Sequence, residues 1–405
     1  MTPLGMIVVI VLIDVLGFSI VMPLLGPFAE HYGFNEGRIG VLFAAYPVCQ
    51  LVAGPILGRL SDRYGRRPLL VYSQAGTAVS FVILGLSHDF WVMLLARMLD
   101  GASGGNFLVA QAYVADVTPP GGRSRGLGLM GMAFGLGFVL GPLMGGALLS
   151  LPVAIDLRLR LPFLVAAGFS TAAWILVLAR LPESRKRGAP LGEQARVFTW
   201  RGMVDTAVLP GVGRLIAIGF LAVLAFATFE GTFALFLNRR MGWNERTAAF
   251  AFSGMGVASA IVQGGLIRRL AARFGERRLI VAGLTTAAVG LAGMAASPNT
   301  PVLIIAMGLL AVGQGLVGPS VGGLLSRTTP HDEQGAVFGV YSSAQTLARL
   351  ISYSMANLML GRVGTTAPYW TACGVEVVAL AVSAPAALGA VVEPAKEPEP
   401  AAHSE

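Results

Sequence analysis

Charged residues are scarce in this 405-residue sequence. Only 12% of its residues are Asp, Glu, Lys or Arg, which is about half the share of an ordinary soluble domain. Lysine occurs just twice, at Lys186 and Lys396, whereas hydrophobic residues make up 55% of the chain. This composition argues against a soluble domain.

Cysteine and histidine are also rare. The two cysteines, Cys49 and Cys373, fall within apolar stretches, where we expect small apolar residues and neither a disulfide nor a metal site. There is no HExxH pattern, and no histidine or lysine lies inside an apolar stretch to activate a nucleophile. We therefore expect no metal, no cofactor and no intramembrane enzyme. The histidines lie in loops or in the tail: His31, His88, His331 and His403.

Long apolar stretches dominate the chain, and most of the twelve have about 20 residues or more, enough to cross the membrane as helices. Outer-membrane strands would appear as short alternating segments, so the pattern predicts an all-α integral membrane protein. The first stretch contains Asp14 and follows no basic residue, which is not the pattern of a cleavable signal. The stretches run near 4–28, 36–58, 69–87, 90–115, 124–150, 161–180, 212–238, 247–267, 279–296, 301–326, 335–361 and 366–391.

Basic residues gather on one side of this predicted bundle. If both termini are cytoplasmic, the inner loops and tail hold 20 of the 29 Lys and Arg, the outer loops hold seven, and Arg97 and Arg349 lie within spans. The positive-inside rule therefore predicts an inner (plasma) membrane protein with both termini in the cytoplasm. We therefore interpret the net charge of +8 as the charge that orients the protein in a lipid bilayer, and we expect no nucleic-acid binding.

The longest polar segment divides the spans six and six. We expect an N-terminal six-helix bundle at 1–180, a cytoplasmic linker at 181–211 and a second bundle at 212–392. The tail 393–405 is rich in Pro and Glu and is expected to be disordered.

Two short repeats relate the halves. Arg63-Tyr-Gly65 recurs as Arg273-Phe-Gly275, an offset of 210, and Asp116-Val-Thr-Pro119 recurs as Arg327-Thr-Thr-Pro330, an offset of 211. The repeats predict a duplicated six-helix unit, with a central cavity between the copies that suits alternating access.

The loop Gly58-Arg-Leu-Ser-Asp-Arg-Tyr-Gly-Arg-Arg67 is the most specific motif. Its glycines allow a tight turn, and Asp62 can accept hydrogen bonds from a helix N-terminus and from Arg66. The loop resembles motif A of the major facilitator superfamily, which in that family closes the cytoplasmic side together with an acid after span 4. The resemblance implies a cytoplasmic gate made of Gly58, Asp62, Arg63, Gly65, Arg66, Arg67 and Asp116.

The second copy of this loop has Ala272 in the place of Asp62. We therefore expect one strong latch, formed by the first half. The alternative is that the loop carries only the positive charge that sets topology.

Span 5 resembles motif C, the mark of antiporters in the same superfamily. Pro142 removes a backbone donor and bends the helix, and the glycines around it let the bend pack closely. A generic kink is the alternative, but five positions match: Gly137, Gly141, Pro142, Gly145 and Gly146.

Span 4 is similar to motif B, with Asp100 in place of the usual Gln. An Arg within a span is costly to bury and faces an acid or a cavity. Asp100 lies three residues beyond Arg97 and can pair with it on one helix face. Two interpretations stay open: a self-neutralising pair, or an Arg97 that takes part with Asp100 in proton coupling.

Three further acids lie within spans. Asp14 and Glu230 each stand alone in an apolar stretch of a span that lines the cavity in this superfamily, so we expect them to bind and release the coupling proton. Glu376 lies in span 12, usually peripheral, and we expect it to be held by a neighbouring helix. Arg349 in span 11 is expected to pair with an acid or to extend to the membrane surface.

A largely apolar substrate cavity is predicted from the cavity-lining spans, because Met and Phe accommodate varied ligands. Its candidate residues are Phe18, Met22, Asn106, Phe107, Gln111, Phe233 and Gln314.

The resemblance covers nearly the whole chain and implies the major facilitator fold, with 12 transmembrane helices as two six-helix bundles around a central cavity. Asp14-Val-Leu-Gly17 in span 1 and Gly242-Trp-Asn244 after span 7 are similar to the tetracycline-exporter-like branch of drug:proton antiporters. That branch carries acids in spans 3 and 9, and this chain does not.

The expected function is proton-coupled efflux of a small amphiphilic drug or metabolite by a monomer. A symporter or facilitator of a sugar or small metabolite is the alternative, which motif C argues against. A receptor or scaffold is a third possibility, which would need no titratable cavity.

Overall fold

The computed structural model describes residues 2–119, 123–184, 211–330 and 334–384, and these contain helices and no strand. The first half comprises α1 (Pro3–Val21), α2 (Leu25–His31), α3 (Glu36–Tyr64), α4 (Arg66–Leu86), α5 (Phe90–Ser103), α6 (Asn106–Val117), α7 (Arg123–Leu148) and α8 (Ile155–Arg180). The second half comprises α11 (Val212–Met241), α12 (Glu245–Ile261), the π-helical turn η2 (Val262–Leu266), α13 (Ile267–Phe274), α14 (Glu276–Ala296), α15 (Thr300–Thr328), α16 (Gln334–Arg362) and α17 (Ala367–Val382).

These elements make twelve helical passages, close to the predicted spans. In the described ranges, nine helical segments are long and apolar enough to cross a membrane, and α17 is a shorter apolar helix. The predicted linker falls outside the described residues apart from 181–184 and Gly211, and the tail 393–405 lies outside them entirely.

Three predicted spans are not continuous helices. Span 1 is divided at Met22–Leu24 into α1 and α2. Span 4 breaks at Gly104 and Gly105 into α5 and α6, because two adjacent glycines weaken a helix. Span 8 consists of α12 and α13 joined by the π turn η2, which contains Gly264 and Gly265. A π turn inserts an extra residue into the helix and changes its direction.

Polar side chains cap the starts of four helices at one end of the molecule. The side chains of Asn35, Asn244 and Asn299 each accept a backbone hydrogen bond at the start of α3, α12 and α15, and Asp89 does the same for α5. Each cap satisfies backbone donors that a helix start leaves free. We call this the outer end and the opposite end, where Gly65 and Gly275 lie, the inner end.

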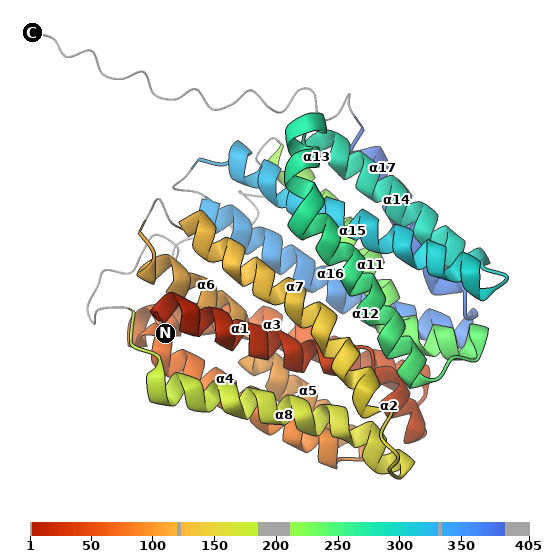
Figure 1. Ribbon diagram of the computed structural model, residues 1–405, viewed down its shortest axis with the longest axis horizontal. Coiled ribbons are helices and arrows are strands. Elements are labelled where there is room, and N and C mark those ends of the chain that lie inside the picture. Colours follow the sequence, from red (N-terminus) through yellow and green to blue (C-terminus); the bar gives the residue numbers. More distant parts are fainter. Residues whose placement is uncertain (1, 120–122, 185–210, 331–333, 385–405) are drawn as a thin grey trace, which may run out of the picture.

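The two halves form two bundles that lie side by side (Figure 1). They meet where α3 packs against α16 and where α7 packs against α12. Both inner turns use the same device, because Gly65 joins α3 to α4 at φ +104° and Gly275 joins α13 to α14 at φ +78°. Only glycine adopts such angles at little cost, so the repeat seen in the sequence is also a repeat of structure.

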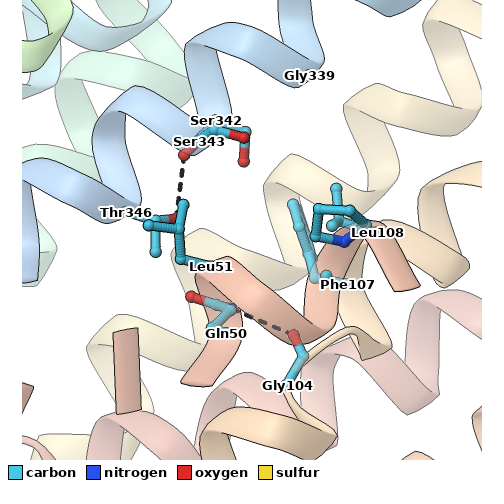
Figure 2. Close-up of a pocket in the computed structure, with 11 residues that line it drawn as sticks. Gln50, Leu51, Gly104, Phe107, Leu108, Gly339, Ser342, Ser343 and Thr346 are labelled. Carbon is cyan, nitrogen blue, oxygen red and sulfur yellow. Dashed lines mark hydrogen bonds between the residues drawn. The ribbon is translucent and has the colours of Figure 1, made fainter. Parts of the chain in front are cut away.

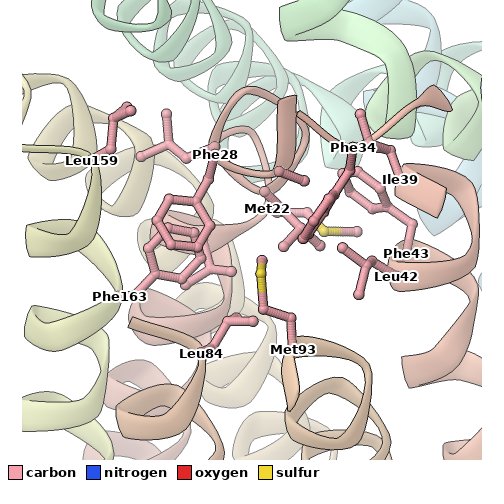
Figure 3. Close-up of a cluster of buried hydrophobic side chains, with 14 of the residues drawn as sticks. Met22, Phe28, Phe34, Ile39, Leu42, Phe43, Leu84, Met93, Leu159 and Phe163 are labelled. Atoms are coloured by element: carbon pink, nitrogen blue, oxygen red, sulfur yellow. The ribbon is translucent and has the colours of Figure 1, made fainter. Parts of the chain in front are cut away.

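An apolar cluster at the outer end spans both bundles. Most of its members come from the first bundle, including Phe28 and Phe163, whose ring centroids are 4.4 Å apart (Figure 3). Leu235, Tyr353 and Leu360 of the second bundle belong to the same cluster. Burial of this shared surface favours a closed outer end.

Candidate functional site

Asp14 lies on α1 inside the first bundle. Its Oδ2 accepts a hydrogen bond of 2.6 Å from Nε2 of Gln74 on α4, and Asn106 at the start of α6 interacts with the same carboxylate. Oδ1 is buried and has no partner among the described residues. The two oxygens of this carboxylate thus have different surroundings.

Arg97 and Asp100 form a buried ion pair on α5. Arg97 Nη1 lies 2.8 Å from Asp100 Oδ2, and the guanidinium carbon of Arg97 lies 5.0 Å from the ring centroid of Tyr46 on α3. Arg97 is only 1% exposed. The pair predicted from helical spacing is present, and it neutralises a charge that would be costly alone.

Glu230 is a buried acid on the first helix of the second bundle. It lies on α11, is 3% exposed, and its Oε2 accepts a 2.6 Å hydrogen bond from the hydroxyl of Tyr353 on α16. Arg349, one turn earlier on α16, interacts electrostatically with Glu230 and also with Tyr46 of the first bundle. Arg349, which was expected to pair with an acid or to extend to the membrane surface, therefore lies near Glu230 and also near the phenol of Tyr46 in the other bundle.

A cleft lies between the bundles in the inner halves of α3 and α16 (Figure 2). Outside it, towards the outer end, the two helices touch: a Cβ added at Gly40 would lie 3.2 Å from Cβ of Asn357. The two helices are thus in contact near the outer end and apart near the inner end. The cleft is lined by Gln50, Leu51, Gly54, Pro55, Gly104, Phe107, Leu108, Gly339, Ser342, Ser343 and Thr346.

Of the predicted cavity residues, Phe107 lines this cleft. Met22 and Phe233 do not; they are 2% and 1% exposed and lie in apolar clusters within the bundles. Asn106 faces Asp14 instead, and Gln314 donates a 3.1 Å hydrogen bond to Oε1 of Glu376 on α17.

Two other predicted cavity residues are also outside the cleft lining. Phe18 lies against the rings of Tyr46 and Phe138, and Gln111 is partly buried on α6. The polar lining comes from α3 and α16, spans 2 and 11, and none of the cavity residues predicted from the sequence lies in these spans. The run Tyr341-Ser-Ser-Ala-Gln-Thr346 was the signal, since so many polar residues are unusual within a span.

Comparison with protein families decides what kind of protein this is. The family model described as Major Facilitator Superfamily matches residues 7–272 and 215–405. The chain belongs to the major facilitator superfamily.

Its relatives include tetracycline resistance proteins and a multidrug resistance protein. The tetracycline resistance protein, class G, of Vibrio anguillarum is 30% identical over 368 residues, which cover 90% of each chain. The class B protein of Escherichia coli is 29% identical, covering 83% of this chain and 82% of that protein. Multidrug resistance protein 1 of Bacillus subtilis (strain 168) is 27% identical, covering 85% and 86%. The chain is a member of the tetracycline-exporter-like branch.

Solved structures of the superfamily share the fold. A bacterial homolog of the human lysosomal transporter Spinster, in an inward-facing and unoccupied conformation, superposes with a TM-score of 0.78 at 15% identity, covering 97% of this chain and 98% of that one. The human organic anion transporter MFSD10 gives a TM-score of 0.73 at 23% identity, covering 94% and 98%.

The superfamily's motif A is centred here on Arg66, which is 4% exposed. Its Nη2 lies 2.8 Å from Asp62 Oδ1 and its Nε lies 3.1 Å from Asp116 Oδ2, the two acids that the sequence indicated. The N-terminus of α4 is capped by Glu183, whose carboxylate accepts from the backbone N–H groups of Arg66 and Arg67. Sequence reasoning assigned helix capping to Asp62 and placed Glu183 in the linker.

Three other motif A positions differ from expectation or add to it. Gly58 lies inside α3 and not in the turn, and its carbonyl accepts a 2.7 Å hydrogen bond from Ser61. Arg67 donates to the carbonyl of Leu178 on α8. Arg63 lies in the last turn of α3, with its guanidinium carbon 5.4 Å from the ring centroid of Tyr64. These hydrogen-bond and ion-pair partners of Arg66 and Arg67 all belong to residues 61–184.

The second copy of the motif contains an ion pair of reversed polarity. Glu276 occupies the position that corresponds to Arg66 at the offset of 210, and Arg327 corresponds to Asp116 at the offset of 211. Arg327 Nη2 lies 3.2 Å from Glu276 Oε1, and the Arg327 side chain is 73% exposed. The expectation that this copy lacks an acid was incomplete: an acid is present, but in the other half of the pair.

Motif C packs α7 against a helix of each bundle. A Cβ added at Gly141 would lie 2.0 Å from Oγ of Ser19 on α1, and one added at Gly146 would lie 2.9 Å from the ring of Phe250 on α12. The Ser19 hydroxyl donates to the carbonyl of Gly137 over 2.8 Å. The motif's glycines thus allow α7 to approach α1 closely while it also contacts the other bundle.

Proposed function

We propose that this chain is a proton-coupled exporter of a small amphiphilic molecule, oriented in the plasma membrane with its inner end towards the cytoplasm. One observation carries the proposal: the first helix of each bundle carries a carboxylate within its apolar length, Asp14 on α1 and Glu230 on α11, and a cleft between the bundles lies towards the inner end. An isolated carboxylate inside a membrane protein marks a proton or substrate path. The relatives named for resistance to tetracycline or to several drugs support export.

The chemistry of the two acids suits antiport. Protons from outside neutralise Asp14 or Glu230, and the substrate binds from the cytoplasm when these groups are charged. At Asp14, Gln74 holds Oδ2, so the proton binds at the unpartnered Oδ1. The two bundles then rock about the contacts of α3 with α16 and of α7 with α12.

The cleft lining supports a substrate that is amphiphilic and without strong charge. Hydroxyl groups of Ser342, Ser343 and Thr346 come from α16, and apolar side chains such as Leu51 and Phe107 face them across the cleft. The lining residues carry no formal charge. No carboxylate lies in the membrane-spanning part of α4 or α14, which argues against export of a metal–tetracycline complex.

The test is transport by purified protein in proteoliposomes with an imposed pH gradient. We expect Asp14→Asn and Glu230→Gln each to abolish gradient-driven export of a candidate amphiphile. Glu376→Gln is the matched control, because Glu376 is a buried acid held by Gln314 and should support export at the wild-type rate. Undiminished export by both variants would refute the proposal, and uptake driven in the direction of proton flow would favour the symporter alternative.

A further inference from the structure

Tyr353 connects a buried acid to the contact between the bundles. Its hydroxyl donates to Glu230, and its ring lies over Gly231, where an added Cβ would be 2.8 Å from Cδ1 of the tyrosine. The absence of a side chain at Gly231 therefore makes the space that Tyr353 occupies. One turn further along α16, Asn357 donates to the carbonyl of Gly231. This hydrogen bond fixes the position of α16 along α11 next to Glu230.

The other face of Tyr353 meets the first bundle. Its ring centroid lies 5.4 Å from that of Phe43 on α3. A Cβ added at Gly40, one turn away on α3, would lie 3.2 Å from the carbonyl oxygen of Tyr353. Tyr353 is 1% exposed and belongs to the apolar cluster that spans both bundles at the outer end. The position of this side chain thus affects how α3 and α16 pack.

We propose that the hydrogen bond from Tyr353 to Glu230 holds the outer end closed while the carrier is deprotonated and empty. The inference rests on the proposed function, in which Glu230 carries a coupling proton. A charged carboxylate is a stronger hydrogen-bond acceptor than a neutral acid, so the bond is strongest after the proton leaves to the cytoplasm. An exchanger needs this property, because an empty deprotonated carrier that reorients lets protons cross without substrate. Tyr353 is a positioning residue in this scheme.

The other charged groups around Glu230 do not compete for this role. Arg349 on α16 and Arg97 on α5 interact with the pair, but arginine is not a residue type that carries coupling protons. Of the helices packed on α11, α17 carries Glu376, which is bonded to Gln314, and α2 carries Glu30, which is paired at the outer end. The charged residues of α12 and α15 lie at the ends of those helices. Glu230 is therefore the group whose charge changes next to Tyr353.

The experiment measures proton flux without substrate in proteoliposomes under an imposed pH gradient. We expect Tyr353→Phe to raise this flux about tenfold over wild type, since loss of a hydrogen bond to a charged group shifts an equilibrium by about that factor. Glu230→Gln and the double variant Glu230→Gln/Tyr353→Phe should show no added flux. Tyr369→Phe, which removes the hydroxyl of another fully buried tyrosine of the same bundle, is the control and should match wild type.

The outcomes separate this inference from the proposed function. If Glu230→Gln still exports substrate under a gradient, the assignment of Glu230 as a proton carrier fails. If Glu230→Gln abolishes export but Tyr353→Phe shows wild-type flux without substrate, the proposed function stands and the role of Tyr353 is wrong. Should Tyr353→Phe fail to fold, Gly231→Ala displaces the same ring, and an unchanged flux in that variant contradicts the inference equally.

Discussion

Nη2 of Arg239, at the end of α11, lies 2.7 Å from Oε1 of Glu30 on α2. The same nitrogen lies 2.8 Å from Oε1 of Glu36, the first residue of α3. Both acids belong to the first bundle and Arg239 belongs to the second, so one guanidinium ties the two bundles together at the outer end. The positive-inside count treated Arg239 only as an outer-loop charge.

Replacing Arg239 should open the outer end. In Arg239→Gln both ion pairs across the interface are lost, and we expect the ratio of outer-open to outer-closed molecules to rise roughly fivefold, the effect of two partly exposed pairs. Distances between spin labels placed at the outer ends of α3 and α11 report this ratio, in a background where Cys49 and Cys373 have been replaced.

Arg240→Gln is a close control for that experiment. Arg240 is the next residue on α11, but its guanidinium donates to the carbonyl of Ser297, in the same bundle. It should leave the label distances unchanged. Equal shifts in both variants would mean that the net positive charge of this helix end matters and the bridge from Arg239 does not.

The motif A cluster allows a comparison between the two copies. We expect Asp62→Asn to lower thermal stability and to favour the inward-open state, because the buried Arg66 loses one of its two acidic partners and an unbalanced buried charge is costly. Glu276→Gln removes the corresponding pair of the second bundle. Its effect should be small, because the Arg327 side chain is 73% exposed and exposed pairs contribute little.

Cysteine accessibility at the inner end and thermal unfolding together measure this comparison. If only the first copy of the motif forms a gate, Asp62→Asn should change both cysteine accessibility and thermal unfolding, and Glu276→Gln should change neither. If accessibility does not change in Asp62→Asn, the loop serves only to set topology.

Features confined to one continuous segment could be read from the sequence. The spans, the turn glycines Gly65 and Gly275, and the pair Arg97–Asp100 depend on spacing within a helix or a repeat, and each is present. The break at Gly104 was also visible as a pair of adjacent glycines. The ion pair of Glu276 with Arg327 could also have been predicted, by comparing the residues that correspond to Arg66 and to Asp116 in the second copy.

Contacts between distant segments could not be read in this way. The cap that Glu183 places on α4 joins residues 117 positions apart, and Arg239 and Glu30 are 209 positions apart. No local periodicity relates such residues. Most of the predicted cavity residues lie outside the cleft lining for the same reason: which faces of α3 and α16 remain apart depends on where the two bundles are closed.

Gly141 of motif C should not tolerate a side chain. In Gly141→Ala the new Cβ would lie 2.0 Å from Ser19 Oγ, so α1 and α7 must separate, and we expect a lower thermal stability and slower export. The added change Ser19→Ala removes the hydroxyl and should restore part of the loss. Gly135→Ala on the same helix, where a Cβ meets nothing within 4 Å, should be neutral or slightly stabilising. A destabilised Gly135→Ala would show that any glycine replacement in α7 is harmful, independent of the contact with Ser19.

A large side chain placed in the cleft between α3 and α16 should prevent a substrate from binding there. Ser343→Trp places a large ring among Gln50, Leu51 and Phe107, and we expect it to abolish the thermal shift that a binding amphiphile causes in the purified protein. Met355→Trp on the same helix is the control, since Met355 is 53% exposed and lies outside the cleft lining. A screen of candidate amphiphiles at two pH values first identifies a ligand that stabilises the wild type. Retention of that shift in Ser343→Trp would place the binding site elsewhere, most directly beside Asp14 and Asn106.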